Sequence, residues 1–242
     1  RPNGKDAWYR AAGSLTGTLQ GPAAITGGGL VCDANGEFLN LAIGAAAQVP
    51  GVAGSVLIDA TIPSNSSTNV LFCLKPKASS DANKVVLYTF GASHYIQLNT
   101  FTSAAAGSAT PSTGLAPAAG RHDFASAWTG INGAAGTAAN YISVDGGTPN
   151  ATTGGTLPRT EADSDGTFDI GNETANTANE IGGTVWRFAV FSVTNPAGQD
   201  LTAAGWSAAA IWNAIFPPDD SAASRHTGYG TGVSGNAVRR FF

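Results

Sequence analysis

Three acidic residues alternate with small residues in the run Glu161-Ala-Asp163-Ser-Asp165. Side chains two residues apart on a strand point to the same face, so such carboxylates could serve as the acid and the base or nucleophile of a glycoside hydrolase. The run lies between Pro158 and Gly166, in a polar stretch without the large apolar residues that would hold a catalytic strand in place. A solvated acidic loop is the favoured interpretation, so we expect no enzyme. A glycoside hydrolase using Glu161, Asp163 and Asp165 stays the alternative.

The same segment could hold a metal ion. Asp163, Asp165 and Asp169 supply carboxylate oxygens around Gly166, and Ca²⁺ prefers clusters of such oxygens. The spacing departs from that of an EF-hand loop, which a bidentate Glu closes. The sequence therefore allows a calcium site at these three residues, with a simple acidic turn as the alternative, and it indicates no other cofactor.

Aromatic side chains suggest a different chemistry, because sugar rings stack on Trp and Tyr faces while nearby polar groups bind the hydroxyls. Trp128, at the end of a predicted strand and close to Asn132, and Tyr95 are the candidates for a glycan site. For each of the two aromatic residues the alternative is a place in the core or at its rim. Three further tryptophans lie in apolar patterns and are assigned to the core: Trp186, Trp206 and Trp212.

The elements that must position these residues read as β-strands. In Tyr141-Ile-Ser-Val-Asp145, Tyr141, Ser143 and Asp145 share one face, and an Asp-Gly turn follows. Strands are expected at residues 30–32, 37–43, 55–62, 69–74, 84–90, 95–101, 121–128, 141–145, 167–170 and 182–193, the last as a central strand. The first two should form a hairpin.

The remaining segments are expected to be loops and one helix. Residues 103–120 and 150–165 are rich in Ala, Ser, Thr, Gly and Pro, which predicts surface loops. Thr202 can cap a short helix that runs to Phe216, where Pro217-Pro218 ends it. In the 182–193 strand, Val185, Arg187, Ala189 and Phe191 should face one way and Trp186, Phe188, Val190 and Val193 largely the other.

The composition of the chain limits which kinds of domain and surface it can form. With 43% hydrophobic and 12% charged residues, the 242-residue chain can bury a sizeable core, and a net charge of -4 excludes a basic surface for nucleic acid. No apolar stretch approaches the length of a membrane helix. We expect an N-terminal arm at 1–22, one sandwich at 23–216 and a C-terminal tail at 217–242. Trp8, Tyr9, Phe241 and Phe242 would let these arms contact neighbouring subunits.

The chain has two cysteines, Cys32 and Cys73, each in a predicted strand. A disulfide between them would need an oxidising compartment and a close approach of the two strands. Two buried free thiols are the favoured interpretation.

Four segments, taken in order, resemble the laminin-G-like branch of the concanavalin A-like lectin/glucanase superfamily. They are 29–41 with its Asp-x-x-Gly turn, 120–128, 141–147, and the closing elements at 168–172, 182–191 and 202–216. One departure is Arg121, which stands where that branch commonly has Trp. The resemblance implies an all-β, jelly-roll-like antiparallel sandwich with one short C-terminal helix, and the composition of the two ends adds extended terminal arms.

The resemblance also implies functions. It leads us to expect a non-enzymatic, lectin-like structural or adhesion protein on the outside of a larger assembly, most readily a bacteriophage virion, as a decoration or glycan-recognition component. Its partners would be other virion proteins or cell-surface glycans, and it would be oligomeric, at a virion surface or outside the cell. The alternative is a secreted bacterial carbohydrate-binding module.

Overall fold

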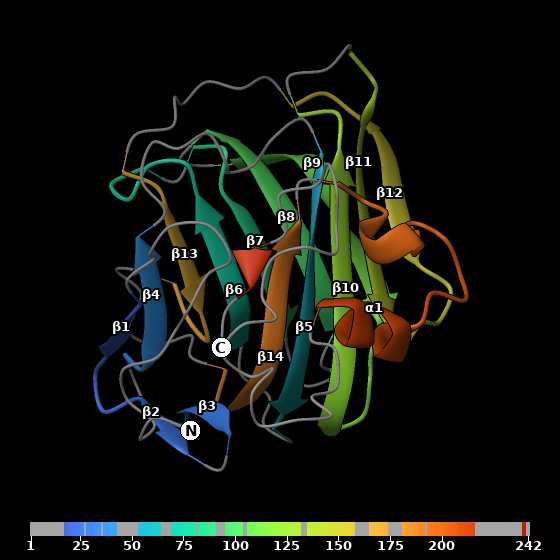
Figure 1. Ribbon diagram of the computed structural model, residues 1–242. Coiled ribbons are helices and arrows are strands. Elements are labelled where there is room, and N and C mark those ends of the chain that lie inside the picture. The colour runs from blue at the N-terminus through green and yellow to red at the C-terminus, as the bar shows by residue number, and fades with distance from the viewer. Residues whose placement is uncertain are drawn as a thin grey trace.

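The protein is described here from a computed structural model (Figure 1). The structure describes residues 17–26, 28–34, 36–42, 53–63, 69–80, 82–90, 95–103, 106–131, 135–157, 165–173, 181–191, 193–215 and 239–240. No helix in these ranges is long and apolar enough to cross a membrane.

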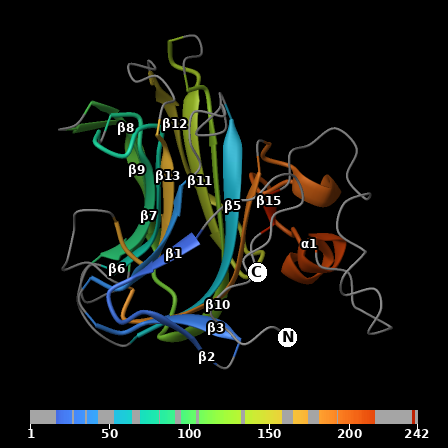
Figure 2. The same cartoon turned by 60° about the vertical axis from the view of Figure 1, so that its left-hand side comes forward.

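Two antiparallel sheets form the molecule, as expected. Sheet A runs in the order β1 (Gly17–Gln20), β4 (Phe38–Ala42), β13 (Thr167–Ile170), β6 (Asn69–Lys75), β7 (Val85–Phe90), β8 (Tyr95–Ser103) and β9 (Ala106–Leu115). Sheet B runs β12 (Asn150–Gly155), β11 (Ala138–Val144), β10 (Gly120–Thr129), β5 (Gly54–Ile62), β14 (Gly183–Phe191), β3 (Gly29–Cys32) and β2 (Ala24–Thr26), and β15 (Arg239–Arg240) pairs with β14. Figure 2 shows the two sheets packed face to face.

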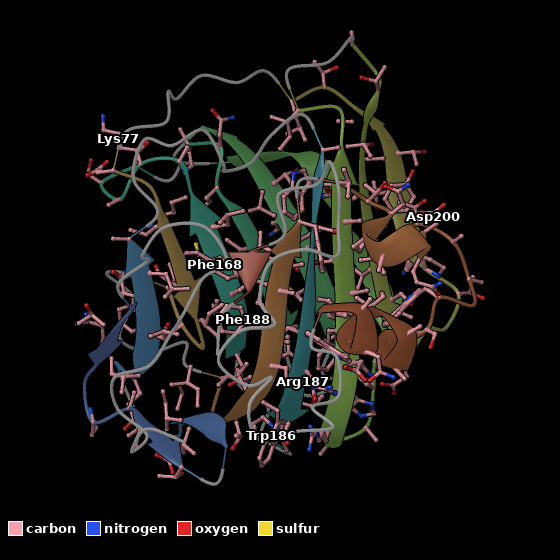
Figure 3. All side chains as sticks on the ribbon, in the orientation of Figure 1. Lys77, Phe168, Trp186, Arg187, Phe188 and Asp200 are labelled. Atoms are coloured by element: carbon pink, nitrogen blue, oxygen red, sulfur yellow. The ribbon has the colours of Figure 1, made fainter. Side chains whose placement is uncertain are left out.

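The main core lies between the sheets. Phe72 of β6 and Phe168 of β13 have ring centroids 5.7 Å apart, and Phe168 is 5.7 Å from Phe188 of β14, so this aromatic chain joins sheet A to sheet B (Figure 3). All three rings are buried. Interdigitated side chains from the two inner faces are the usual source of stability in a sandwich.

A second core covers the outer face of sheet B. The helix α1 (Ala208–Ile215) and the segment that contains the 3-10 helix η1 (Pro196–Gly198) lie on this face (Figure 2). Small residues of the sheet, Ala125, Ala127 and Ala189, pack with Trp206 and Trp212, as the sequence predicts for these two tryptophans. Small side chains on the strands leave room for the two indole rings.

The helix begins later than expected. It starts at Ala208, and the Ser207 hydroxyl accepts a hydrogen bond from the Ala210 N–H at 3.1 Å, which is the N-cap interaction. Thr202 instead donates its hydroxyl to Asp200 at 2.6 Å. The side chain in place to satisfy the first free N–H groups decides where the helix begins.

The predicted hairpin is wrong, although both of its strands exist. β3 belongs to sheet B and β4 to sheet A, so the chain crosses between sheets at this turn. The Glu37 carboxylate accepts the N–H groups of Asp33 and Ala34 at 2.6 and 2.8 Å. A buried carboxylate bonded in this way shapes a local turn that does not pair the flanking strands.

Two predicted loops are strands. β9 lies within residues 103–120 and pairs with β8 through several bulges, and β12 lies within 150–165 and pairs with β11. Both are terminal strands of their sheets. An edge strand needs few apolar side chains, because hydrogen bonds to one neighbour hold it, so its composition resembles that of a loop.

The strand β14 is central, as expected, and its predicted alternation is confirmed from Arg187 to Phe191 but is wrong at Val185, Trp186 and Val193. A bulge between Val185 and Arg187 in the pairing with β5 inserts Trp186. Val185 and Phe188 therefore share the inner core, and Ala189 lies in the second core. Trp186 is only partly buried, so its assignment to the core is also wrong.

The sandwich extends beyond the expected boundaries. Gly17–Gln20, assigned to the N-terminal arm, is β1 and pairs with β4. Arg239–Arg240, assigned to the tail, pairs with Ala189 and Val190 of β14. Trp8, Tyr9, Phe241 and Phe242 lie outside the described residues, so their assembly role stays a prediction.

Both cysteines are buried free thiols, so the disulfide alternative is wrong. Cys32 belongs to the core between the sheets, whereas Cys73 packs with Val70 and Val86 on the other face of sheet A. The body of sheet A separates the two sulfur atoms.

Candidate functional site

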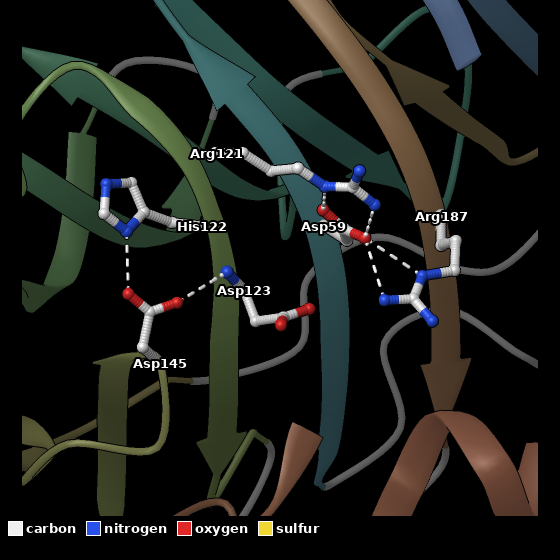
Figure 4. A pocket seen from close by; sticks show the side chains of 6 residues that line it. All are labelled: Asp59, Arg121, His122, Asp123, Asp145 and Arg187. Carbon is white, nitrogen blue, oxygen red and sulfur yellow. Dashed lines mark hydrogen bonds and ion pairs between the residues drawn. The ribbon is translucent and has the colours of Figure 1, made fainter. Parts of the chain in front are cut away.

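A polar hollow of about 310 Å³ lies on the outer face of sheet B (Figure 4). It is lined by Asp59, Arg121, His122, Asp123, Asp145 and Arg187. These residues come from the three adjacent strands β5, β10 and β14 and from the turn after β11. Trp186 and Arg187 mark its position near the lower end of β14 (Figure 3).

Strand register brings the lining residues together. Asp59 of β5 lies directly opposite Asp123 of β10 on one side and opposite Arg187 of β14 on the other. Arg121 shares a face with Asp123 because the two are separated by one residue of a strand. Residues from three distant parts of the chain thus form one surface.

Asp59 is the centre of this surface. Its Oδ1 and Oδ2 accept hydrogen bonds from Arg121 Nε and Nη2 at 2.8 and 2.6 Å. Its Oδ2 also accepts a hydrogen bond from Arg187 Nε at 2.9 Å and forms an ion pair with Arg187 Nη2 at 2.9 Å. The Asp59 side chain is 3% exposed, whereas those of Arg121 and Arg187 are 51% and 41% exposed. These hydrogen bonds raise the pKa of Arg121. A buried carboxylate therefore anchors two guanidinium groups that reach the solvent.

Each guanidinium group also stacks on an indole. Arg121 Cζ lies 4.6 Å from the centroid of the Trp186 ring, and Arg187 Cζ lies 4.6 Å from that of Trp212. The indoles are themselves held: Trp186 Nε1 donates to Thr61 Oγ1 at 2.9 Å, and Trp212 Nε1 donates to Asp123 Oδ1 at 2.8 Å. Stacking fixes the plane in which each arginine presents its remaining N–H groups.

The surroundings of the Asp123 carboxyl group disfavour its ionised form. Burial raises its pKa, and the neighbouring carboxylates of Asp59 and Asp145 raise it further. The hydrogen bond from Trp212 and the positive charge of Arg187 lower it. A ligand hydroxyl that donates to Asp123 would stabilise its ionised form.

His122 and Asp145 form the far wall. His122 Nδ1 lies 2.7 Å from Asp145 Oδ2, and its Nε2 lies 3.1 Å from the carbonyl oxygen of Ala118. Asp145 Oδ1 accepts the Asp123 N–H at 2.9 Å. Asp145 has a φ of 52° and Gly146 a φ of 75°, which is the conformation of a type I′ turn. The predicted Asp-Gly turn is therefore confirmed, and it holds a carboxylate at the edge of the hollow.

The site presents hydrogen-bond donors and acceptors within one open surface. The bonds to Asp59 leave further N–H groups on Arg121 and Arg187, and Asp123 Oδ2 accepts no hydrogen bond from a described residue. Such a mixed set can bind hydroxyl groups, which donate and accept at the same atom.

The glycan candidates do not belong to this hollow. Trp128 is 1% exposed and lies in the core between the sheets, next to Gly54, so no sugar can stack on it and this prediction is wrong. Tyr95 begins β8, in sheet A. The Tyr95 side chain and the whole of Asn132 lie outside the described residues, so their roles stay predictions.

The calcium candidates are partly described. Asp165 is exposed and accepts the Ala78 N–H at 3.3 Å. Asp169 is fully buried in β13 and accepts a hydrogen bond from Asn40 Nδ2 at 2.6 Å. Within the part of the chain that the structure describes, no three His, Cys, Asp or Glu side chains are grouped for a metal. Glu161 and Asp163 lie outside it, so the calcium site and the acidic-loop hydrolase stay untested.

Sequence reasoning missed Asp59, Arg121, Asp123 and Arg187 as site residues. A usable signal was present at Asp59, the single charge in the apolar strand Val56-Leu-Ile-Asp-Ala60. A charge in a buried strand needs partners, and the sequence offers Arg121 and Arg187 in two other strands. Which strands lie beside β5 is a property of the fold.

Comparison with known proteins shows similarity of structure only. No family model matches the chain, and no curated protein matches its sequence. Trypanosoma rangeli sialidase in complex with sialic acid superposes with a TM-score of 0.51 at 17% identity, over 74% of this chain and 27% of the sialidase chain. The chain thus spans about a quarter of the length of that sialidase.

Two smaller proteins give lower scores. A heptameric SAP-like pentraxin from Limulus polyphemus has a TM-score of 0.49 at 13% identity and covers 93% of this chain and 94% of its own. Domain 4 of AbnA, a GH43 extracellular arabinanase from Geobacillus stearothermophilus in complex with arabinotriose, has a TM-score of 0.45 at 14% identity and covers 77% of this chain and 81% of its own. At such identities a likeness concerns the fold alone. The strand topology and the sialidase superposition show that the chain has the concanavalin A-like lectin/glucanase fold.

Proposed function

We propose that the protein is a non-catalytic, lectin-like adhesion module that binds a glycan in the hollow on sheet B. The observation that carries this proposal is the pair of arginines fixed by Asp59. The side chains of Arg121 and Arg187 are about half exposed, yet each is held by a carboxylate and an indole. Donors held in this way lose little conformational entropy when a ligand binds.

The opposite wall supports the same proposal. Asp145 is 54% exposed and sits at the rim, and Asp123 offers its Oδ2. A saccharide could accept hydrogen bonds from the arginines while donating to these carboxylates. The polar lining and the open shape suit a weakly held surface glycan better than an enclosed small molecule.

The test compares Asp145→Asn with Asp200→Asn on a glycan array. Asn also suits the type I′ turn, so Asp145→Asn removes the charge and keeps the fold. Asp200 is an exposed aspartate whose described side-chain hydrogen bonds are to Thr202, so it is the matched control. We expect Asp145→Asn to weaken binding about tenfold and the control to bind as the wild type does. Absence of glycan binding by the wild-type protein would refute the proposal.

The proposed setting is the outside of a larger assembly, most readily a bacteriophage virion, and otherwise an extracellular location. Its support is the resemblance of the ordered sequence segments to the laminin-G-like branch. The test is the mass of the native particle from unfractionated source material, measured by light scattering after size exclusion. A mass far above that of the 24.2 kDa chain would support assembly. A glycan-binding monomer would instead identify a secreted carbohydrate-binding module.

A further inference from the structure

The charges of the hollow restrict the class of glycan, provided that the proposed function holds. Three carboxylates, from Asp59, Asp123 and Asp145, face two guanidinium groups, from Arg121 and Arg187. His122 is the remaining titratable group of the lining and is paired with Asp145. Three carboxylates face at most three positive charges, so the lining has no surplus positive charge for an acidic ligand.

The arginines are not free to bind an anion strongly. Asp59 already accepts hydrogen bonds from Nε and Nη2 of Arg121 and from Nε of Arg187, whose Nη2 forms an ion pair with the same carboxylate. Asp59 thus occupies one of the two edges through which a guanidinium group can form a two-bond fork with a ligand carboxylate, and it already balances part of the positive charge. The terminal N–H groups that remain on each arginine can donate to hydroxyl oxygens, which carry no charge that needs a further counter-charge.

The carboxylates on the other wall would repel an acidic sugar. Asp145 is exposed at the rim, and Asp123 of β10 lies directly opposite Asp59 of the neighbouring strand β5. A ligand carboxylate bound in the hollow would share it with the carboxylates of Asp123 and Asp145, and like charges repel. A hydroxyl group has no such cost and can donate to either carboxylate.

We infer that the hollow is a site for uncharged saccharides, recognised through neighbouring hydroxyls that accept from Arg121 and Arg187 and donate to Asp123 and Asp145. The ligand hydroxyls would then form hydrogen bonds with both the arginines and the carboxylates of the hollow. Sialic and uronic acids are disfavoured at the same place.

The experiment measures binding of full-length protein to matched oligosaccharide pairs. One pair differs by a terminal sialic acid, and another by a uronic acid in place of the neutral hexose. We expect the neutral member of a pair to bind about tenfold more tightly. In Asp145→Asn the ratio of the two affinities should fall. The neutral oligosaccharide loses a charged hydrogen-bond acceptor, and the acidic one no longer meets the negative charge of Asp145. Asp200→Asn should retain the preference.

The outcomes separate the two proposals. Tighter binding of the acidic members would overturn the inference and leave the proposed lectin function standing. A neutral preference that Asp145→Asn leaves unchanged would place recognition elsewhere and overturn the inference too. Failure of every pair to bind would refute the proposed function, and the inference with it.

Discussion

Asp59 and Asp123 occupy directly opposed positions on the antiparallel strands β5 and β10, so two carboxylates project side by side from one face of sheet B. Like charges in such a pair destabilise a sheet unless other groups compensate. Asp59 is compensated by Arg121 and Arg187, and Asp123 by the indole N–H of Trp212. The polar hollow is therefore a mutually dependent set of charges.

Replacing Asp59 by Asn should destabilise the protein. Both arginines would lose their shared counter-charge, and a buried amide would take its place. We expect the free energy of unfolding to fall by about 1–3 kcal/mol in urea titration. Asp200→Asn, at an exposed position, should change it by less than about 0.5 kcal/mol. An equal effect of the two substitutions would contradict the central role of Asp59.

The raised pKa of Asp123 has a consequence for stability against pH. Burial makes the ionised form less favourable in the folded state than in the unfolded chain, so the folded state takes up the proton more readily. The stability contributed by the protonated form is fully present below the unfolded pKa and is lost as pH rises through the folded pKa. Ionised Asp123 thus lowers stability at neutral pH.

Asp123→Asn tests this directly, because the amide stays neutral and its oxygen can still accept from Trp212. The variant should be more stable than the wild type at pH 7, by under about 1 kcal/mol, since the site is partly exposed. The gain should vanish as pH falls through the acid range, where the wild-type carboxyl is also neutral. Urea titrations across that range measure the gain in the free energy of unfolding. A gain that persisted at acid pH would exclude the carboxyl charge as its cause.

The two thiols should be unreactive in the folded protein. Burial, together with the nearby carboxylates of Glu173 and Asp169, raises the pKa of Cys73 well above its usual value, and Cys32 lies in the inner core. Since the thiolate is the reactive form, alkylation should be slow in native buffer and complete in denaturant for both residues. Mass spectrometry of the labelled protein measures this. A pair of hydrogens missing from the intact mass, or a Tm lowered by reductant, would instead indicate a disulfide.

Gly171 should tolerate no side chain. Its φ is 90°, and a Cβ there would lie 2.7 Å from Cys32 Sγ. Gly154 has nearly the same φ, 91°, with open space around the added atom. Gly154→Ala should therefore cost about 1 kcal/mol for the backbone conformation alone, and Gly171→Ala should cost at least about 2 kcal/mol. Equal losses in urea titration would show that the packing against Cys32 can relax.

Much of the fold could be predicted because local patterns dictate it. The strands at 55–62, 69–74 and 167–170 combine apolar residues with turn residues at their ends, and each is a strand of the sandwich. The Asp145-Gly146 turn follows from the positive φ that a type I′ turn needs. These preferences act over a few residues, so the sequence alone reveals them.

Edges and irregularities could not be predicted, because they depend on neighbours. β9 and β12 are strands only because β8 and β11 offer free hydrogen-bonding groups beside them. The bulge at Trp186 moves that indole out of the core and under Arg121. No local pattern in the sequences of β9, β12 or β14 indicates these partners.

The sequence by itself determined the class of the molecule: an antiparallel sandwich with a short helix, two buried thiols and an Asp145-Gly146 turn. Only the tertiary structure decided where the chemistry lies. Trp128 lies in the core. The outer face of sheet B brings together four charged residues: Asp59, Arg121, Asp123 and Arg187. The physical reason is that hydrophobic periodicity depends on residues close together in the chain, whereas strand order and register bring together charges from distant strands.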